Sequence, residues 1–536
     1  MNSANTASIT STTGTTGTTG IKLAEPHLED VLSSAGINVE YTRAERNTLY
    51  YRDQDGQEVP VLDLVGGFGS LILGHNDPEI VAHARELLAA GTPIHAQFSP
   101  HPHANRVAAE LNRVIHRETG DTEPYFAVFA NSGAEAVEAA VKHAELDRGL
   151  RLAALAEELA AHRDSAREAV AAGARVEAAA FESAGTAPED GIEGLIEAVE
   201  RSNDRQLARP PLFLAPEGAF HGKLMGSVQL THNEAFRLPF SALAAQTRFI
   251  PVDQPDALAK TVREERAVIL DLVTEDGTVR LTERPFPLFC AFVLEPIQGE
   301  GGIKVIGEEF AREVQRVCQE IDCPVVVDEI QSGMGRSGAF LASSLIGLRA
   351  DYYTLAKSLG GGVAKTSVAL IRQDRYRKEF ELVHSSTFAK DGFSSQIALK
   401  TLQLLEADDG RAYRLAREKG EKLLSVLELI RADFPEVVKD VRGRGLMLGI
   451  EFHDQAGTAS PEIRAVAEAG FLGYVISGHL LNEHRIRVFP TGSSVNTLRM
   501  EPSIHLDDEE IERIRRALRA VCEIIRDQDG GRLVHA

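Results

Sequence analysis

The chain has no tryptophan, only four cysteines among its 536 residues, and no long apolar run. The cysteines show no paired C-x-x-C spacing, so we expect reduced thiols in an intracellular protein. No apolar stretch approaches the roughly 18 residues that span a bilayer, and the N-terminus lacks a basic segment followed by an apolar core. We therefore predict a cytoplasmic location without an export signal or a membrane segment. No cluster with metal-ligand spacing is present, so no metal is predicted.

Basic residues are fewer than acidic residues. Lys and Arg total 57 against 79 Asp and Glu, which gives a formal net charge of −22. This balance argues against nucleic acid or an anionic membrane as a partner, because both attract an excess of positive charge. The length exceeds the usual size of a single hydrophobic core, so two or more domains are expected.

One lysine stands at the end of an apolar strand, directly before a glycine-rich turn. Residues 352–356 predict the strand, and Lys357 is followed after two residues by three glycines. The glycines allow a tight turn and a close backbone approach to a bound group. An amine in so apolar a setting has its pKa pulled toward neutrality, which makes Lys357 a usable nucleophile toward an aldehyde. The alternative is that Lys357 merely begins a surface loop.

A second apolar run ends in a carboxylate. Residues 324–327 are followed by Asp328, which predicts a buried parallel strand with an acid at its C-terminal end. Ligands of open α/β sheets bind at such strand ends. A carboxylate there can keep a pyridine nitrogen protonated, and a protonated pyridine is the electron sink of pyridoxal phosphate (PLP) chemistry. The alternative roles of Asp328 are a helix cap and a structural ion pair.

A third strand leads into a helix with a clear start signal. Ser132 and Glu135 have the spacing of a capping box, so a helix begins here and its pattern continues to about Asp147. The exposed amides and the dipole at that helix start would hold a phosphate, and the Ser132 hydroxyl adds a donor. The other interpretation is a well-capped helix without a ligand.

These segments occur with several others in the order seen in class III PLP-dependent aminotransferases. The chain resembles that family from about Tyr50 to Ile514, apart from one insertion. The segments are residues 131–136, 220–222, 295–302, 328–338, 355–362, 384–388, 442–449 and 498–500. The resemblance implies an α/β protein of fold type I, with a large domain around a mostly parallel seven-stranded sheet and a smaller α+β domain. It also implies PLP as cofactor and a homodimer with shared active sites.

The resemblance implies a role for each matching residue. Lys357 would hold PLP as an aldimine, be displaced by the amino donor, and then move the proton between the donor carbon and the cofactor. Asp328 would pair with the ring nitrogen. The other expected cofactor contacts are Ser132, Gly133 and Ala134 with the phosphate, Thr387 of the partner subunit with the same phosphate, Phe220 on the ring face, Gln331 on the ring hydroxyl, and His221 and Glu295.

Two charged residues are expected to select the acceptor. In the family members that the chain resembles, the glutamate at Glu300 masks the arginine at Arg499 while an ω-amino donor is bound. It then moves aside so that the arginine binds a carboxylate of 2-oxoglutarate. A fixed ion pair is the alternative. Glu501 follows where paired prolines are usual, and this added acid would weaken the hold of Arg499 on an anion.

The sequence departs from the family at three places. About 60 residues, 148–210, replace a short connection, and apolar positions on two helical faces predict a helical hairpin there. We favour a packed surface elaboration over a partner-docking module. Lys365 follows the glycines and is a rival nucleophile to Lys357. Lys223 stands where ornithine-type members place an arginine, which puts the donor pocket in question, since a lysine lacks the planar fork.

The expected organisation is a disordered tail (1–25), an N-terminal segment of the small domain (26–69), a large PLP-binding domain (70–400) and a C-terminal small domain (401–536). The predicted activity is transfer of an amino group from an amine or amino acid, with an ω-amino donor favoured, to a 2-oxo acid, 2-oxoglutarate being favoured. The mechanism would be ping-pong through the Lys357 aldimine. A racemase, aminomutase or decarboxylase of the same fold is the alternative, because the protein only selects which bond breaks. A non-catalytic scaffold is the remaining class.

Overall fold

The computed structural model describes residue 25 and residues 27–534, except for residues 97, 98, 101, 244, 245 and 255. The predicted disordered tail lies outside these described residues, apart from its last position. Among the described helices, none has the length and apolar character needed to cross a membrane. The same part of the chain holds no group of three or more His, Cys, Asp and Glu placed to bind a metal ion.

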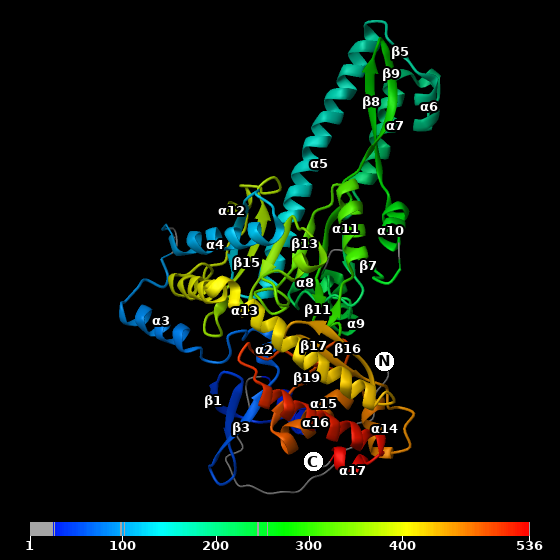
Figure 1. The fold of residues 1–536 in the computed structure, drawn as a ribbon. Coiled ribbons are helices and arrows are strands. Elements are labelled where there is room, and N and C mark those ends of the chain that lie inside the picture. Colours follow the sequence, from blue (N-terminus) through cyan, green and yellow to red (C-terminus); the bar gives the residue numbers. More distant parts are fainter. Residues whose placement is uncertain are drawn as a thin grey trace.

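A seven-stranded, mostly parallel sheet forms the centre of the molecule (Figure 1). In spatial order its strands are β4 (Tyr125–Ala130), β15 (Ser367–Arg372), β14 (Tyr352–Leu355), β13 (Val325–Asp328), β10 (Phe289–Leu294), β6 (Leu212–Pro216) and β7 (Gln246–Ile250). Within this sheet β15 runs antiparallel to both of its neighbours, and the other pairings are parallel. Every residue of β10, β13 and β14 is buried, as expected of strands covered on both faces. The predicted α/β fold class is confirmed.

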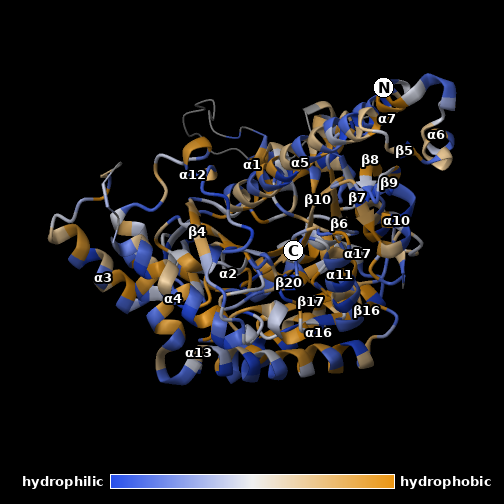
Figure 2. Ribbon diagram, turned by 90° about the horizontal axis from the view of Figure 1, so that it is seen from above, coloured by the Kyte–Doolittle hydropathy of each residue, from blue (hydrophilic) through white to orange (hydrophobic). Residues whose placement is uncertain are grey.

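Helices lie around this sheet (Figure 1). They include α3 (Pro78–Ala89), α4 (Pro102–Thr119), α8 (Met225–Gln229), α9 (Glu234–Arg237), α10 (Ala257–Glu265), α11 (Glu308–Glu320), α12 (Phe380–Val383) and α13 (Gly392–Asp433). In α11, Phe310, Val314 and Val317 fall on one face and are buried. Figure 2 shows the same alternation of hydrophobic and hydrophilic residues along α4 and α13.

A second region combines the two ends of the chain, at the bottom of Figure 1. One of its sheets consists of β1 (Tyr41–Glu45), β2 (Thr48–Arg52), β3 (Glu58–Asp63) and β18 (Ile486–Arg487); the other consists of β16 (Val438–Arg444), β17 (Met447–Phe452), β20 (Thr497–Met500) and β19 (Phe489–Pro490). Helices α1 (Leu28–Ser34), α14 (Pro461–Glu468), α15 (Leu472–His484), α16 (Asp508–Arg526) and α17 (Gly530–Val534) accompany them. The short helix α2 (Gly66–Gly69) and the two-stranded pair β11 (Ile297–Gln298) and β12 (Lys304–Val305) complete these elements.

An arm projects from the central sheet, at the top of Figure 1. It contains the distal half of α5 (Gly133–Ala171), with β5 (Arg175–Val176), α6 (Ala178–Ala184), α7 (Gly191–Leu207), β8 (Val268–Glu275) and β9 (Thr278–Pro285). Its own small core includes Phe181, Leu195, Val199 and Leu272. The insertion therefore has a hydrophobic core that is closed by a later β-hairpin.

The sequence prediction for this insertion is wrong about where its first helix ends. The first helix does not end near Asp147, because α5 is continuous to Ala171. Gly149 is tolerated since the residues around it are mostly strong helix formers. Leu159, in the distal part of α5, packs in the main core, whereas α6 and α7 pack against the three-stranded sheet β5-β9-β8.

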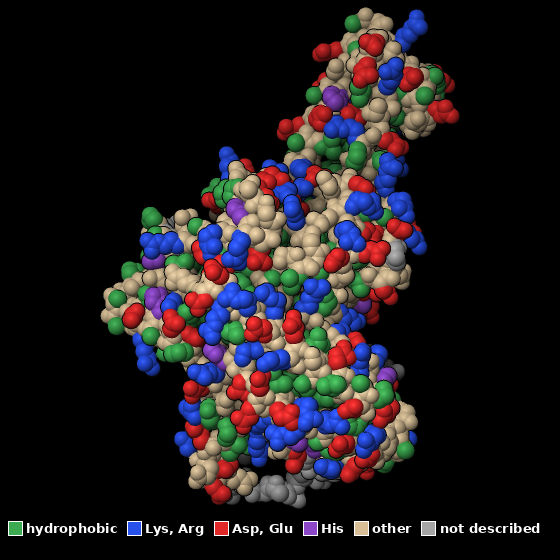
Figure 3. All heavy atoms as spheres, in the orientation of Figure 1, with side chains coloured by type: hydrophobic (Ala, Val, Ile, Leu, Met, Phe, Trp, Pro, Cys, Tyr) green, Lys and Arg blue, Asp and Glu red, His purple; other side chains and the backbone are tan. Residues whose placement is uncertain are grey.

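The surface carries charges of both signs in close mixture. On the face shown in Figure 3, Lys and Arg side chains are interspersed with Asp and Glu over the arm, the central part and the lower region alike. On this face the excess of acidic residues is thus spread out and is not gathered into one block.

Candidate active site

Lys357 lies where the sequence places it, at the end of a buried strand. β14 ends at Leu355, and Lys357 opens the single turn η4 (Lys357–Gly360) with φ of 45°, a left-handed value that is strained for a lysine. Its Nζ donates a hydrogen bond of 2.8 Å to Gln331 Oε1. Burial lowers the pKa of Lys357, and the carboxylates of Glu501 and Glu300 oppose that shift. Lys365, the rival, is exposed.

The glycines after Lys357 are needed for close packing. Gly361 has φ of 57°, and a Cβ there would lie 2.5 Å from Ile80 Cδ1. A side chain at Gly361 would therefore have a strained backbone and would crowd Ile80 of α3.

Asp328 is held by a histidine from another loop. Its Oδ2 accepts a hydrogen bond of 2.8 Å from His221 Nδ1, and its Oδ1 accepts hydrogen bonds from Thr354 Oγ1 at 3.2 Å and from the amide of Ile330 at 3.1 Å. Burial alone would lower the pKa of His221, but Asp328 outweighs this effect and the pKa is raised. The other ring nitrogen, Nε2, is buried and has no hydrogen-bond partner in the part of the chain that the structure describes.

Glu295 is hydrogen-bonded to the loop that contains His221. Its carboxylate accepts hydrogen bonds from the amide of Phe220 at 2.9 Å and from the amide of Gly299 at 3.0 Å. Burial raises the pKa of Glu295 to about 7. The backbone on the N-terminal side of His221 is thus fixed by a buried acid that titrates near neutrality.

The start of α5 lies against both of these loops. Ser132 caps the helix, and the predicted capping box with Glu135 is present. A Cβ on Gly133 would lie 2.9 Å from Ile330 Cγ2, and a Cβ on Gly222 would lie 2.6 Å from the Cβ of Ala134. The amides of Gly133 and Ala134 belong to the first turn, where a helix has no internal acceptors. This terminus therefore presents donors directly beside the loops of Asp328 and His221.

A chain of polar contacts runs from Lys357 to the strand β20. Gln331 accepts from Lys357 and donates from Nε2 to Glu501 Oε1 at 2.7 Å. Glu501 Oε2 lies 3.9 Å from Arg499 Nη1. Arg499 Nη2 donates a 2.5 Å hydrogen bond to Glu300 Oε2. The carboxylates of Glu300 and Glu501 thus both face the guanidinium of Arg499, close to Lys357.

The Glu300–Arg499 pair is unequally exposed. The Arg499 side chain is 1% exposed, whereas that of Glu300 is 17% exposed. Burial alone would raise the pKa of Glu300, but Arg499 outweighs it and the pKa is lowered. Glu300 is therefore held as a carboxylate on the open side of a buried arginine.

Lys223 does not join this group of contacts. It is exposed, and its Nζ lies 4.0 Å above the ring of Phe236 in α9. The same ring meets Phe220 edge to face, with centroids 6.3 Å apart. Lys223 and Phe220 are thus connected through one aromatic side chain.

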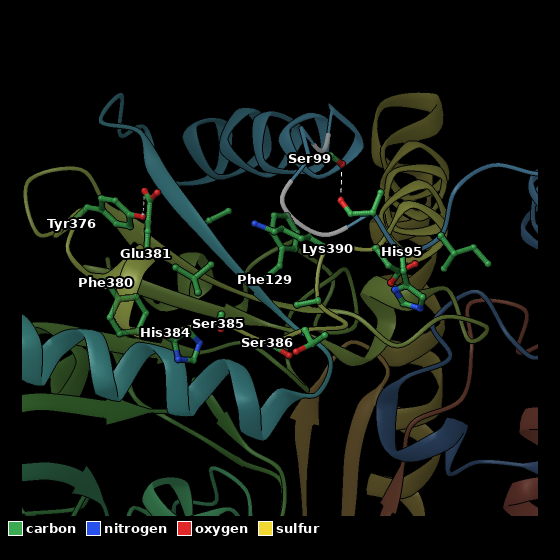
Figure 4. Close-up of a pocket in the computed structure, with 17 residues that line it drawn as sticks. His95, Ser99, Phe129, Tyr376, Phe380, Glu381, His384, Ser385, Ser386 and Lys390 are labelled. Carbon is green, nitrogen blue, oxygen red and sulfur yellow. Dashed lines mark hydrogen bonds between the residues drawn. The ribbon is translucent and has the colours of Figure 1, made fainter.

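Thr387 lines a separate pocket of about 840 Å³ between β4, α12 and residues 384–391 (Figure 4). Thr387 is exposed, and the neighbouring Ser386 Oγ accepts a hydrogen bond of 2.9 Å from Asn131 Nδ2. The loop of Thr387 thus contacts the residue just before the start of α5 in the same chain.

One residue of this site, Thr354, was not given a role from the sequence. Thr354 supports Asp328, and the sequence signal was the register of neighbouring strands, since the two residues are paired on β13 and β14. Glu501 was noticed as an unusual acid beside Arg499, but its hydrogen bond to Gln331 requires the tertiary fold. The structure brings together Lys357, Gln331, Glu300 and Arg499, and groups Asp328 with His221.

A strand-end lysine, a strand-end carboxylate and a helix start beside one mostly parallel sheet define the fold and site of a PLP-dependent transferase. The model of the class-III aminotransferase family matches residues 32–521. The chain therefore belongs to the class-III aminotransferase family and is a PLP-dependent aminotransferase.

Solved structures agree on the fold. An ornithine aminotransferase from Toxoplasma gondii is 21% identical, with a TM-score of 0.63 over 90% of this chain and 91% of that one. A transaminase from the marine bacterium Virgibacillus is 16% identical, with a TM-score of 0.65 over 91% and 94%. The ornithine δ-aminotransferase of Plasmodium falciparum is 18% identical, with a TM-score of 0.60 over 91% and 94%.

The residues present fit PLP. The α5 start offers free amides for a phosphate, and Asp328 offers a buried carboxylate whose position is fixed by three hydrogen bonds. The Lys357 amine has the lowered pKa that bond formation with an aldehyde requires. Together these groups supply an anion site, a counter-charge and a nucleophile.

Proposed function

We propose that this aminotransferase moves an amino group from a primary ω-amine or amino acid to a 2-oxo acid, with 2-oxoglutarate as the acceptor. The observation that carries the proposal is the Glu300–Arg499 pair beside Lys357. Arg499 is buried and Glu300 covers it on the exposed side. This arrangement suits a pocket that binds first an amine without a carboxylate and then an anionic 2-oxo acid. The two half-reactions would share this pocket, as a ping-pong mechanism requires.

Residues of three segments would hold the cofactor. We assign the phosphate to Ser132, Gly133 and Ala134, the ring face to Phe220, the ring nitrogen to Asp328 and the ring hydroxyl to Gln331. His221 would orient Asp328 through the 2.8 Å hydrogen bond, and Glu295 would fix the loop of Phe220. When bound, PLP supplies an electron sink that stabilises the charge left after proton loss from the donor carbon.

Lys357 is the proposed catalytic base and acid. Its Nζ would take the proton from the donor carbon and return it at the neighbouring position of the cofactor. A lowered pKa favours this task, because the amine must be neutral to accept a proton. Gln331 Oε1 would orient the amine through the bond that it accepts.

Arg499 is the proposed acceptor-binding residue. With an amine in the site, Glu300 would keep the guanidinium neutralised. With 2-oxoglutarate in the site, Glu300 would turn toward the solvent and a substrate carboxylate would replace it in two parallel hydrogen bonds. Lys223, near Phe220 and Phe236, is assigned to the donor side of the pocket.

A homodimer with shared sites is part of the proposal, with Thr387 reaching the phosphate of the partner subunit's cofactor. The pocket around Thr387 is bordered by exposed apolar side chains, of which Leu382 is 91%, Val383 65% and Phe388 61% exposed. A cluster of this kind suits contact with a second subunit. We also propose residues 70–400 as the large domain and residues 26–69 with 401–536 as the small one, which the pairing of β3 with β18 supports.

The cytoplasm is the proposed location. All four cysteines are unpaired and buried, as suits a reducing compartment.

A half-reaction screen tests the activity. Purified enzyme is mixed with amines and amino acids in the absence of an acceptor, and cofactor absorbance is followed. Transamination predicts one equivalent of cofactor converted to its amine form per site, followed by recovery on addition of 2-oxoglutarate. Turnover without this stoichiometric change would contradict the proposal.

A further inference from the structure

Glu501 is a buried acid next to the acceptor-binding arginine. It follows β20 directly and has no exposed surface. Its Oε1 accepts the 2.7 Å hydrogen bond from Gln331, whereas Oε2 has no hydrogen-bond partner among the described residues and faces Arg499 Nη1 at 3.9 Å. In the same part of the chain, the Arg499 Nε and Nη1 atoms also lack hydrogen-bond partners. The negative charge of Glu501 thus partly offsets the positive charge of Arg499, although the two side chains are not hydrogen-bonded to each other.

The two acids beside Arg499 differ in freedom. Glu300 is partly exposed and can turn outward by giving up its hydrogen bonds to Arg499 and to the amide of Gly492. Glu501 is enclosed: a Cβ on Gly69 would lie 3.0 Å from its Oε1, and Gln331 holds the same oxygen. Only Glu300 can therefore leave when a substrate carboxylate arrives.

Cations lie near Glu501 among the described residues. Arg336 and Lys357 both interact with its carboxylate, as Arg499 does. Arg336 is fully buried and donates to the carbonyls of Leu446 and Pro502, so it stays in place when a substrate binds. Glu501 is the fixed negative charge in this group.

We propose that Glu501 is a specificity-determining residue that weakens the binding of carboxylate-bearing acceptors at Arg499 and so admits uncharged aldehydes as alternative acceptors. A substrate carboxylate at Arg499 gains the attraction of the guanidinium but is repelled by Glu501, whereas an aldehyde without a carboxylate meets neither effect. The inference rests on the proposed function, in that Arg499 is taken to bind the acceptor.

The test compares kcat/KM for three acceptors in the holoenzyme, with one carboxylate-free amine as the donor. The acceptors are 2-oxoglutarate, pyruvate and butanal. Glu501→Gln keeps the size of the side chain and an oxygen for Gln331 but removes the charge. We expect the ratio of kcat/KM for 2-oxoglutarate to that for butanal to rise about tenfold, equivalent to about 1.4 kcal/mol. The pyruvate-to-butanal ratio should rise in the same direction.

Glu501→Asp is the matched control, because it keeps the charge and shortens the side chain. Its acceptor ratios should stay within about twofold of the wild type, even if its stability falls. Ratios within one variant do not depend on the fraction of folded enzyme, so partial unfolding does not obscure the result. An unchanged or lower ratio in Glu501→Gln, or the same rise in Glu501→Asp, would overturn the inference.

Failure of the inference and failure of the proposed function give different results. If Arg499→Lys lowers the 2-oxoglutarate-to-butanal ratio while Glu501→Gln leaves it unchanged, only the inference about Glu501 is wrong. If Arg499→Lys leaves the ratio unchanged as well, the assignment of Arg499 to the acceptor is wrong.

Discussion

The Nδ1 atom of His221 lies 2.8 Å from Oδ2 of Asp328, although the two residues are 107 positions apart in the chain. His221 is fully enclosed and follows the loop residue that Glu295 holds. An acid that titrates near neutrality, a histidine and a strand-end carboxylate therefore form one buried unit under the site. The free energy of unfolding should therefore depend on pH through Glu295 and His221.

The first prediction concerns Glu295. Its pKa is about 7 in the folded protein and close to 4.5 when unfolded, so its stabilising contribution is complete below about pH 4.5 and is lost as the pH rises through about 7. The raised pKa of His221 acts in the same direction. Between about pH 5 and pH 8, the wild type should lose on the order of 2 kcal/mol of unfolding free energy relative to Glu295→Gln. Denaturant unfolding at equal cofactor loading measures this difference, and a pH-independent difference would contradict the assignment.

The second prediction concerns Lys357. Lys357→Ala should abolish turnover while leaving the fold intact, because the amine that donates to Gln331 at the strand end is removed. Borohydride reduction followed by mass spectrometry should find no covalent cofactor in this variant. Lys365→Ala, which removes an exposed lysine, should keep both turnover and the covalent cofactor. Covalent cofactor in Lys357→Ala would transfer the role to Lys365.

The third prediction concerns Thr387. Thr387→Val replaces a hydroxyl by a methyl group and should weaken cofactor retention severalfold, since a phosphate contact is lost. Equilibrium dialysis of PLP measures the retention. Light scattering at assay concentration should show a dimer for both proteins, and an active monomer would refute the shared site.

The fourth prediction concerns the arm. Phe181 is buried in the arm core with Leu195 and Leu272, so Phe181→Ala should cost about 3 kcal/mol of local stability. Hydrogen exchange should accelerate in α6, α7 and β8–β9, while cofactor binding and turnover remain at wild-type levels. Phe181→Leu is the milder control. A parallel fall in turnover would show that the arm supports the site.

The sequence predicts the strand-end residues well because their signals are local. Lys357 and Asp328 each follow a short apolar run, and those runs become the adjacent strands β14 and β13. The capping box at Ser132 is equally local. The bond between His221 and Asp328, by contrast, depends on how two distant loops pack, and no spacing in the chain encodes it.

The arm shows where a local signal was missed. Residues 268–285 alternate apolar and polar side chains around Asp276 and Gly277, which is a hairpin pattern, and they form β8 and β9. Their packing against α7 closes a core that the insertion alone could not complete. The length of α5 was underestimated, although the residues around Gly149 are mostly strong helix formers.

The last prediction concerns Arg499. The guanidinium donates from Nη2 to Glu300, and its Nε and Nη1 have no hydrogen-bond partners among the residues that the structure describes. It therefore has donors available for an incoming carboxylate once Glu300 moves. Arg499→Lys keeps the charge but loses the planar fork. The KM for 2-oxoglutarate should rise at least about tenfold, corresponding to roughly 1.4 kcal/mol of lost binding, with a smaller change for pyruvate. Steady-state kinetics with a fixed amine donor measures both constants, and Glu300→Gln serves as the companion variant because it unmasks the same arginine. Equal losses for both acceptors, or none for either, would mean that Arg499 and Glu300 form a structural ion pair and that the acceptor binds elsewhere.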